Sequence, residues 1–254
     1  MAAFTVTESK EVSGLPGSDP LSTWQGLITV DGPNFAACQR SKYVIPAKAI
    51  ASISYTIPIF GDFKTHLNLF YTGYAPYSNS FCYTNDMNGD GVNNDLMYIY
   101  ASGNDIKWAD ATTASAQAAA YDAFLAQDKY LSAHKGQYAE AYAARAPWSN
   151  RFDFRIAQDL AFRAGGQKHN FQVLVDLMNI GNMFNSKWGI WKTNDVSNNC
   201  RILTYKGLNA AGEPTFEMGK VDGKYISKTY DYPAANVGYT QCWNFQIGLR
   251  YLFN

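Results

Sequence analysis

Residues 243–253, WNFQIGLRYLF, carry the clearest pattern in the chain. Every odd position in this stretch, from Trp243 to Phe253, is aromatic or aliphatic. The even positions are mainly polar or glycine, namely Asn244, Gln246, Gly248, Arg250 and the exception Leu252. A period of two places these two sets on opposite faces of one β-strand. The stretch also matches the ~9–11 residues with which a tilted strand crosses a bilayer.

The same alternation recurs upstream. Residues 151–162, RFDFRIAQDLAF, place aromatic and aliphatic side chains on one face and charged ones on the other. Residues 49–59 alternate Ala, Ile and Tyr with Ser and Thr, while residues 65–74 and 171–179 alternate less cleanly. We predict an all-β, antiparallel fold with about five membrane-length strands, a segment of a transmembrane β-barrel. The charged residues expected to face its lumen are Arg151, Asp153, Arg155, Asp159 and Arg250.

These charges allow two interpretations. Charged side chains interleaved with aromatic ones need either partners or a wet surrounding, because an unpaired charge is costly in a dry core. In a lumen, Asp153, Arg155 and Asp159 either bind substrate or form a structural ladder with the neighbouring strands. The ladder is the simpler hypothesis, since it requires only adjacent strands of the same sheet.

Aromatic residues also gather near the predicted strand ends. Trp148 and Trp243 at one end, with Phe162, Tyr251 and Phe253 at the other, match the two aromatic girdles of a membrane protein. The alternative is the core of a soluble β-sandwich, whose outer face is also charged. The pattern by itself does not separate these two folds.

Composition excludes several classes of protein. The chain has 254 residues with 21 basic and 21 acidic side chains, and this zero net charge argues against a nucleic-acid binder. No run of ~18 apolar residues predicts a transmembrane helix, and residues 1–12 lack the basic and apolar regions of a signal peptide. None of the common hydrolase, phosphate-loop, zinc-protease or dinucleotide motifs occurs, so we predict that the protein is not an enzyme.

The predicted strands are joined by connections of two sizes. Turns at 61–64 and 163–169 are short, whereas Pro76–Pro147 and Ile180–Gly238 are long. Short periplasmic turns and long external loops are typical of outer-membrane barrels. The first long loop predicts short helices, one over Ser115–Leu125, and the second predicts a small hairpin of residues 201–205 and 215–218. The expected layout is 1–45 mainly external loop, 46–75 hairpin, 76–147 external loop with helices, 148–180 hairpin, 181–238 external loop and 239–254 terminal strand.

One constellation has the residue types of a calcium loop. Aspartate, asparagine and aspartate stand at alternate positions before a glycine, as in the first half of an EF-hand loop. The candidate oxygen ligands are Asp86, Asn88, Asp90, Val92 through its carbonyl, and Asp95. Met97 stands where that loop requires glutamate, so only a minimal calcium turn is expected. The alternative is an Asx- and glycine-rich turn without metal, because these residues dominate turns in general.

The chain has four cysteines, Cys38, Cys82, Cys200 and Cys242, and no CxxC pair. Zinc is therefore not expected, whereas an oxidising compartment would favour disulfides. We expect all four near the external end of the strands and favour the pairs Cys38–Cys82 and Cys200–Cys242, because each pair flanks adjacent strand ends. The alternative is buried thiols that act as small hydrophobic residues.

Several segments together resemble the carboxy-terminal part of TonB-dependent outer-membrane receptors of the Oar-like and SusC-like type. They occur in the order of that family, with similar spacing, and cover nearly the whole chain. Most specific is the combination of DMNGDGVNNDLMYI, KGQYAE and DLMNIGNMFNSKWG. The full segments are PAKAIASISYTIPIF (46–60), LNLFYTGYAPYSNSFCYTNDMNGDGVNNDLMYIYAS (67–102), YLSAHKGQYAEAYAARAPWSNRFDFRIAQDLAF (130–162), NFQVLVDLMNIGNMFNSKWGIWK (170–192) and WNFQIGLRYLFN (243–254).

The resemblance implies an energised transporter in the outer membrane of a Gram-negative bacterium, which takes up a nutrient such as an oligosaccharide or a peptide. Its partners would be outer-membrane lipid, the remainder of a barrel of about 22 strands with its plug, TonB, and a surface lipoprotein. Closed single-chain barrels begin at about eight strands, so about five cannot close one. We therefore expect a fragment of a longer receptor or a subunit of a split barrel, not functional alone. The alternative is a soluble or surface-displayed all-β binding module stabilised by calcium.

Overall fold

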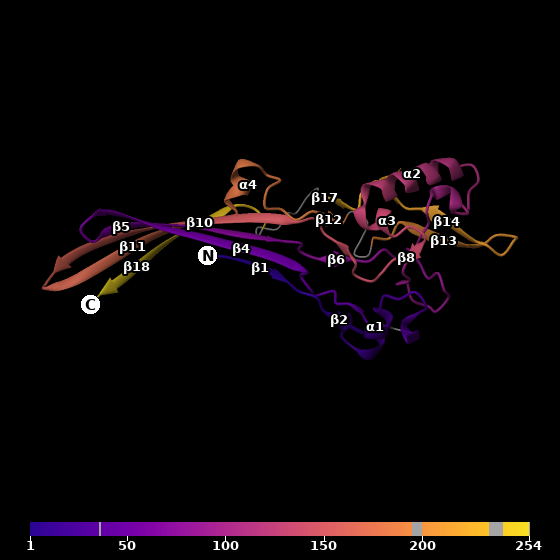
Figure 1. Ribbon diagram of the computed structural model, residues 1–254, viewed down its shortest axis with the longest axis horizontal. Coiled ribbons are helices and arrows are strands. Elements are labelled where there is room, and N and C mark those ends of the chain that lie inside the picture. The colour runs from indigo at the N-terminus through magenta and orange to yellow at the C-terminus, as the bar shows by residue number, and fades with distance from the viewer. Residues whose placement is uncertain (36, 195–199, 234–240, 254) are drawn as a thin grey trace.

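A six-stranded antiparallel sheet forms one end of the molecule (Figure 1). The computed structural model describes residues 1–35, 37–194, 200–233 and 241–253. Residues 252 and 253 are described by their backbone only. The fold is mostly β, with 44% of residues in strands and 15% in helices. In sheet order, the strands are β1 (Ala2–Val6), β4 (Ala47–Phe60), β5 (Phe63–Tyr74), β10 (Ser149–Ala164), β11 (Gln167–Met178) and β18 (Asn244–Phe253). The structure confirms that the fold is mostly β with antiparallel sheets, and no sheet among the described residues is closed into a barrel.

Tight turns set the register of the sheet. Gly165 and Gly166 join β10 to β11 with φ angles of +59° and +78°, which are strained for residues with a Cβ. Two positive φ angles in succession are typical of the type I′ turn, whose twist matches that of the flanking strands. The register then runs without interruption from Ala164 opposite Gln167 to Phe154 opposite Leu177.

The register aligns the alternating residues of neighbouring strands into rows. One row crosses the sheet through Ile53, Leu69, Phe154, Leu177 and Phe245. The next residue on each strand contributes to a polar row of Ser54, Asn68, Arg155, Asp176 and Gln246. We call the side of the sheet with the first row the apolar face and the opposite side the polar face. The predicted alternation therefore extends across five strands.

One strand was not expected. Residues 1–45 are predicted to be mainly loop, but β1 pairs along β4, from Ala2 opposite Ala51 to Val6 opposite Ala47. The reason is that β4 presents an open row of backbone hydrogen-bonding groups, which a short extended segment satisfies whatever its side chains. Within the described residues, β1 and β18 are the two edges of the sheet, which is not closed.

The two long connections fold together into a loop domain, defined here as residues 76–147 and 200–233. Its main elements are α2 (Ala114–Gln127), α3 (Lys129–Ala133), and the hairpin of β13 (Leu203–Leu208) and β14 (Pro214–Met218). Both the helix and the hairpin predicted for these loops are confirmed. The described core of the protein lies mainly here, with fully buried side chains that include Phe81, Met97, Tyr121, Phe124, Leu131, Ile202 and Phe216.

Backbone pairing joins the two connections directly. Tyr83 forms a parallel bridge with Leu203, and Trp108 forms one with Phe216. The buried Gln117 side chain of α2 accepts a hydrogen bond from the backbone N–H of Met218 at 2.7 Å. The loop domain is therefore one packed unit rather than two separate loops.

Short elements complete the fold. The small two-stranded sheets are β2 (Lys10–Glu11) with β3 (Gln39–Arg40), β6 (Ser78–Asn79) with β9 (Ala144–Arg145), β7 (Tyr98–Ile99) with β8 (Gln137–Tyr138), β12 (Thr193–Asn194) with β17 (Tyr230–Asp231), and β15 (Lys220–Val221) with β16 (Lys224–Tyr225). The remaining helices are α1 (Pro20–Gln25), η1 (Pro33–Phe35), η2 (Gly103–Asp105) and α4 (Ile180–Phe184). No helix among the described residues is both long and apolar enough to cross a membrane.

Candidate functional site

The polar face of the sheet carries paired charges. Arg155 on β10 and Asp176 on β11 form two parallel hydrogen bonds, with Nη2 2.8 Å from Oδ2. Beside them, Arg151 Nε donates to Asp153 Oδ1 at 2.9 Å, and the backbone N–H of Asn179 donates to the same oxygen at 2.7 Å. These partners pair three of the five charges predicted from the alternation, namely Arg151, Asp153 and Arg155. The geometry fits the structural ladder better than a set of substrate-binding charges.

A second cluster on this face centres on a histidine that the sequence alone did not single out. His66 Nε2 lies 2.8 Å from Asp159 Oδ2, and its Nδ1 lies 3.0 Å from the Thr56 hydroxyl. The other Asp159 oxygen accepts a hydrogen bond from the Gln172 side chain at 2.8 Å. Gln172 stands opposite Arg250 in the register, so the remaining predicted residue lies in the same row of the sheet. Only the register of five strands, β4, β5, β10, β11 and β18, brings these residues together.

A groove of about 470 Å³ lies along this polar face. Its lining comes from four strands and includes Ser54, Asn68, Asp153, Arg155 and Asp176. The lining also includes apolar residues such as Leu69, Phe70 and Met178, so hydroxyl, amide and charged groups stand beside apolar ones in this groove.

The apolar face is bare in the described structure. The side chains of Ile53, Ile247 and Leu249 are 68%, 67% and 70% exposed, although aliphatic residues of this size usually lie inside a fold. Their neighbours in adjacent rows are also exposed, namely Tyr55, Ile59, Phe152, Phe162, Phe245 and Tyr251. An apolar surface this continuous is typical of a region that contacts lipid or another protein.

The aromatic girdle residues lie on this same face. Trp148 directly precedes β10 and Phe162 lies near its other end, and both are partly exposed. Trp243 precedes β18, and Tyr251 near its end stacks on Phe171 with ring centroids 4.5 Å apart. The side chain of Phe253 lies outside the described residues.

The predicted calcium turn has its carboxylates directed at its own backbone. Asp86 accepts hydrogen bonds from the N–H groups of Gly89 at 2.7 Å and Gly91 at 2.8 Å. Asp90 accepts one from Val92 N–H at 2.8 Å, and Asp95 accepts one from Met87 N–H at 2.6 Å. The side-chain amide of Asn88 donates to Asp90 at 3.1 Å. Such bonds are those of an Asx turn, the metal-free alternative.

No group of three or more metal-ligating His, Cys, Asp or Glu side chains occurs among the described residues. Gly89 and Gly91 have φ angles of +79° and +85°, so glycine is required at both positions by the turn itself. The glycines and aspartates of this segment are therefore explained by backbone geometry. Calcium binding here remains a hypothesis.

The cysteines do not form the favoured pairs. Cys38 is an exposed thiol, whereas Cys82 is a fully buried one in the core of the loop domain. Cys200 is also a fully buried thiol of that core, while Cys242 is half-buried. The burial of Cys82 raises its pKa to about 12. Cys82 and Cys200 lie in the two long connections that pack on each other in the core of the loop domain. Both fit the alternative of buried thiols.

No protein-family model, curated protein or solved structure matches this chain. A proposal about its function therefore depends on the two-faced sheet and on the sequence resemblance. The described sheet combines a groove with polar and apolar lining, an exposed apolar face and two open edges.

Proposed function

We propose that this chain is the carboxy-terminal section of the β-barrel of a TonB-dependent outer-membrane receptor. The observation that carries the proposal is the bare apolar face, which continues in register across five strands. Lipid would cover the exposed side chains of Ile53, Ile247 and Leu249, and each would gain about 1.5–3 kcal/mol from leaving water. The opposite face would then line the barrel interior.

The two sheet edges support a larger assembly. An open edge in lipid leaves N–H and C=O groups without partners, and each costs several kcal/mol. Further strands that pair with β1 and β18 would remove this cost. Those strands, the plug and the TonB contact are expected outside the residues printed here, either in the same polypeptide or in a partner chain.

The loop domain supports an external role. It lies at the opposite end of the molecule from the tight turn at Gly165 and Gly166 (Figure 1). In an outer-membrane barrel, short turns face the periplasm and long loops face the outside. The loop domain would therefore cover the external mouth, and a hydrophilic nutrient such as an oligosaccharide or a peptide would pass along the polar face. A surface lipoprotein is the partner expected above this mouth.

The soluble binding module is the competing function. It requires another layer over the apolar face, and the other sheets among the described strands have only two strands each. A β-sandwich would likewise need a second large sheet to cover the apolar face, and the described residues contain none.

Membrane fractionation of the intact protein tests the proposal. We expect it in the outer-membrane fraction, with a gel mobility that changes on heating as folded barrels do. A charged residue on the apolar face, as in Ile247→Arg, should destabilise the barrel by about 2–4 kcal/mol. The matched variant Gln246→Arg places the same charge on the polar face and should be tolerated. Soluble periplasmic behaviour of the intact protein, or equal effects of the two variants, would contradict the proposal.

A further inference from the structure

A pocket of about 430 Å³ lies where the apolar face meets the loop domain. One wall comes from the start of β10, through Trp148, Asn150 and Phe152. The other wall comes from the segment after α4, through Lys187 and Trp188, and is closed by Lys192 and Tyr232. Residues distant in sequence thus build one cavity at the boundary between an apolar and a polar surface.

The first wall is apolar and held in place. Trp148 Nε1 donates to Asn150 Oδ1 at 3.1 Å, which fixes the indole ring at the start of the strand. The ring of Phe152 packs on Tyr71, its neighbour in the register, with centroids 5.0 Å apart. This wall is continuous with the apolar face that would contact lipid.

The second wall is basic. The ammonium groups of Lys187 and Lys192 lie 5.5 Å and 4.9 Å from the centroid of the same Tyr232 ring. Asp231, next to Tyr232 in the sequence, accepts a hydrogen bond from Lys228 at 2.7 Å, and the charge of Lys192 also helps to lower the pKa of its carboxyl. Two ammonium groups gathered at one ring attract an anion, and lysine is a common ligand of phosphate groups.

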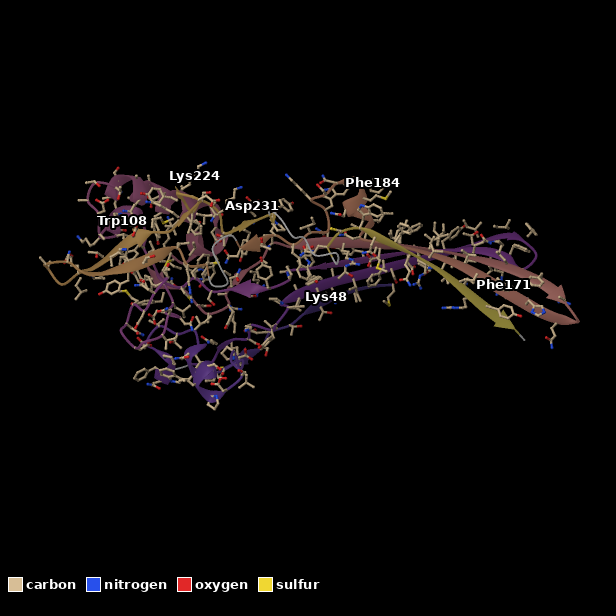
Figure 2. All side chains as sticks on the ribbon, turned by 180° about the vertical axis from the view of Figure 1, so that it is seen from behind. Lys48, Trp108, Phe171, Phe184, Lys224 and Asp231 are labelled. Carbon is tan, nitrogen blue, oxygen red and sulfur yellow. The ribbon has the colours of Figure 1, made fainter. Side chains whose placement is uncertain are left out.

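The segment that carries Lys187 has an apolar projecting surface. Phe184, Met183 and Trp188 are 75%, 54% and 57% exposed. Figure 2 shows Phe184 on the part of the chain that projects from the sheet near its junction with the loop domain. A free inorganic anion would make no contact with these apolar side chains, and a neutral glycan would gain nothing from the charges of the two lysines. An anionic amphiphile would contact both the apolar side chains and the lysines.

We propose that this pocket binds the phosphorylated headgroup of an acylated, anionic lipid in the outer leaflet, with its acyl chains along Trp148, Phe152 and Trp188. This inference rests on the proposed function, because it needs the apolar face to lie in a membrane. The bound lipid would fix the loop domain at the membrane surface. It would also fill the gap between β10 and the segment after α4.

Lipid binding to the intact protein in detergent micelles tests the proposal. The probes are diphosphorylated lipid A, the same lipid without its phosphates, and inorganic phosphate, with bound molecules counted by native mass spectrometry. We expect saturable binding of one diphosphorylated lipid. The variant Lys187→Ser/Lys192→Ser should weaken it about thirtyfold, since each of the two lysines near an anionic headgroup contributes about 1 kcal/mol and every 1.4 kcal/mol is a factor of ten.

A matched control removes two other lysines. Lys220 lies 5.0 Å from the Tyr225 ring, and Lys224 is nearby on the same hairpin of the loop domain. The variant Lys220→Ser/Lys224→Ser should bind lipid as the unchanged protein does. Three outcomes would overturn the proposal. The first is that the dephosphorylated lipid binds as tightly as the diphosphorylated one, and the second is that the control variant loses as much affinity as Lys187→Ser/Lys192→Ser. The third is that inorganic phosphate competes for the site as well as the lipid does. If the protein is membrane-bound and heat-modifiable but shows no phosphate preference, only this inference fails. If it is soluble, the proposed function fails.

Discussion

Arg155 and Asp176 stand opposite each other on β10 and β11, and their side chains form two parallel hydrogen bonds, with Nη2 2.8 Å from Oδ2. This geometry predicts a structural ladder rather than a substrate site. Because the Arg155 side chain is 51% exposed, solvent screens the pair, and its coupling energy should be below about 1 kcal/mol. A double-mutant cycle of Arg155→Ala and Asp176→Ala, followed by urea unfolding in micelles, measures it. If the chain is part of a receptor as proposed, the intact protein with both substitutions should retain nutrient uptake. A large loss of uptake with normal folding would favour the substrate-binding interpretation.

The turn between β10 and β11 makes a second prediction. Gly165→Ala and Gly166→Ala each force a Cβ into the left-handed region, which costs roughly 1–2 kcal/mol. Each variant should therefore lower the urea midpoint of the sheet. Gly248→Ala is the matched control, because a Cβ there would meet Leu174 at an ordinary contact distance of 3.5 Å. If all three variants unfold at the same urea concentration, the two-residue turn does not set the register.

Thiol reactivity separates the cysteine interpretations. Cys38 is exposed, so an aromatic disulfide reagent should modify it rapidly at pH 8. Cys82 should react only on unfolding, because it is buried and its pKa is raised to about 12, which leaves almost no thiolate. Peptide mapping by mass spectrometry identifies the modified residues, and Cys38→Ser should abolish the rapid phase. A Cys38–Cys82 disulfide would instead leave both residues unmodified until a reductant is added.

Local patterns predicted the strands and turns of the sheet well. A strand such as β18 alternates with a period of two because its two faces meet different surroundings, and this signal needs no distant residue. The Gly165–Gly166 pair and the alanine-rich α2 are local signals of the same kind. The fold class, the two hairpins of the sheet and α2 could therefore be predicted from short windows of sequence.

The loop domain could not be predicted in this way. Phe81 and Phe124 meet edge to face with centroids 6.5 Å apart, and Tyr83 stacks on Phe216 at 5.5 Å. No periodicity marks these positions, since the chain between them is irregular. The link between His66 and Asp159 was missed for a related reason. The pairing of β5 with β10, whose strands are joined by a long connection, places a lone histidine beside that carboxylate, and no sequence motif marks it.

The turn at Asp86 makes a prediction about metal. Its carboxylate accepts hydrogen bonds from the N–H groups of Gly89 and Gly91, which are exposed. In Asp86→Ala water replaces the carboxylate as their acceptor, so the loop domain should lose about 0.5–1.5 kcal/mol. Because the turn is satisfied without a cation, millimolar calcium should leave the thermal midpoint of the unchanged protein where it is. A midpoint that rises with calcium, and no longer does so in Asp90→Asn, would support the calcium hypothesis.

Asp95 gives the loop domain a pH dependence of known sign. Burial raises the pKa of this carboxyl, and the charges of Asp90 and Asp86 raise it further, while hydrogen bonds from the backbone of Met87 and Asn88 oppose the shift. A raised folded-state pKa means that the folded protein holds the proton more tightly than the unfolded chain does. The stabilising contribution is therefore fully present below the unfolded pKa of about 3.9, and it is lost as pH rises through the folded value.

Asp95→Asn tests this sign, because an amide oxygen can still accept the Met87 N–H but carries no charge. The variant should unfold at higher urea than the unchanged protein at pH 7.5, and the difference should disappear near pH 4. Asp110→Asn is the control with the opposite sign. Hydrogen bonds from the Thr112 hydroxyl and N–H and from the Thr113 hydroxyl lower the pKa of the Asp110 carboxyl. Loss of this carboxylate should therefore destabilise the protein at pH 7.5 and have a smaller effect in acid. If Asp95→Asn shows the same difference at both pH values, the charge on Asp95 does not act on stability.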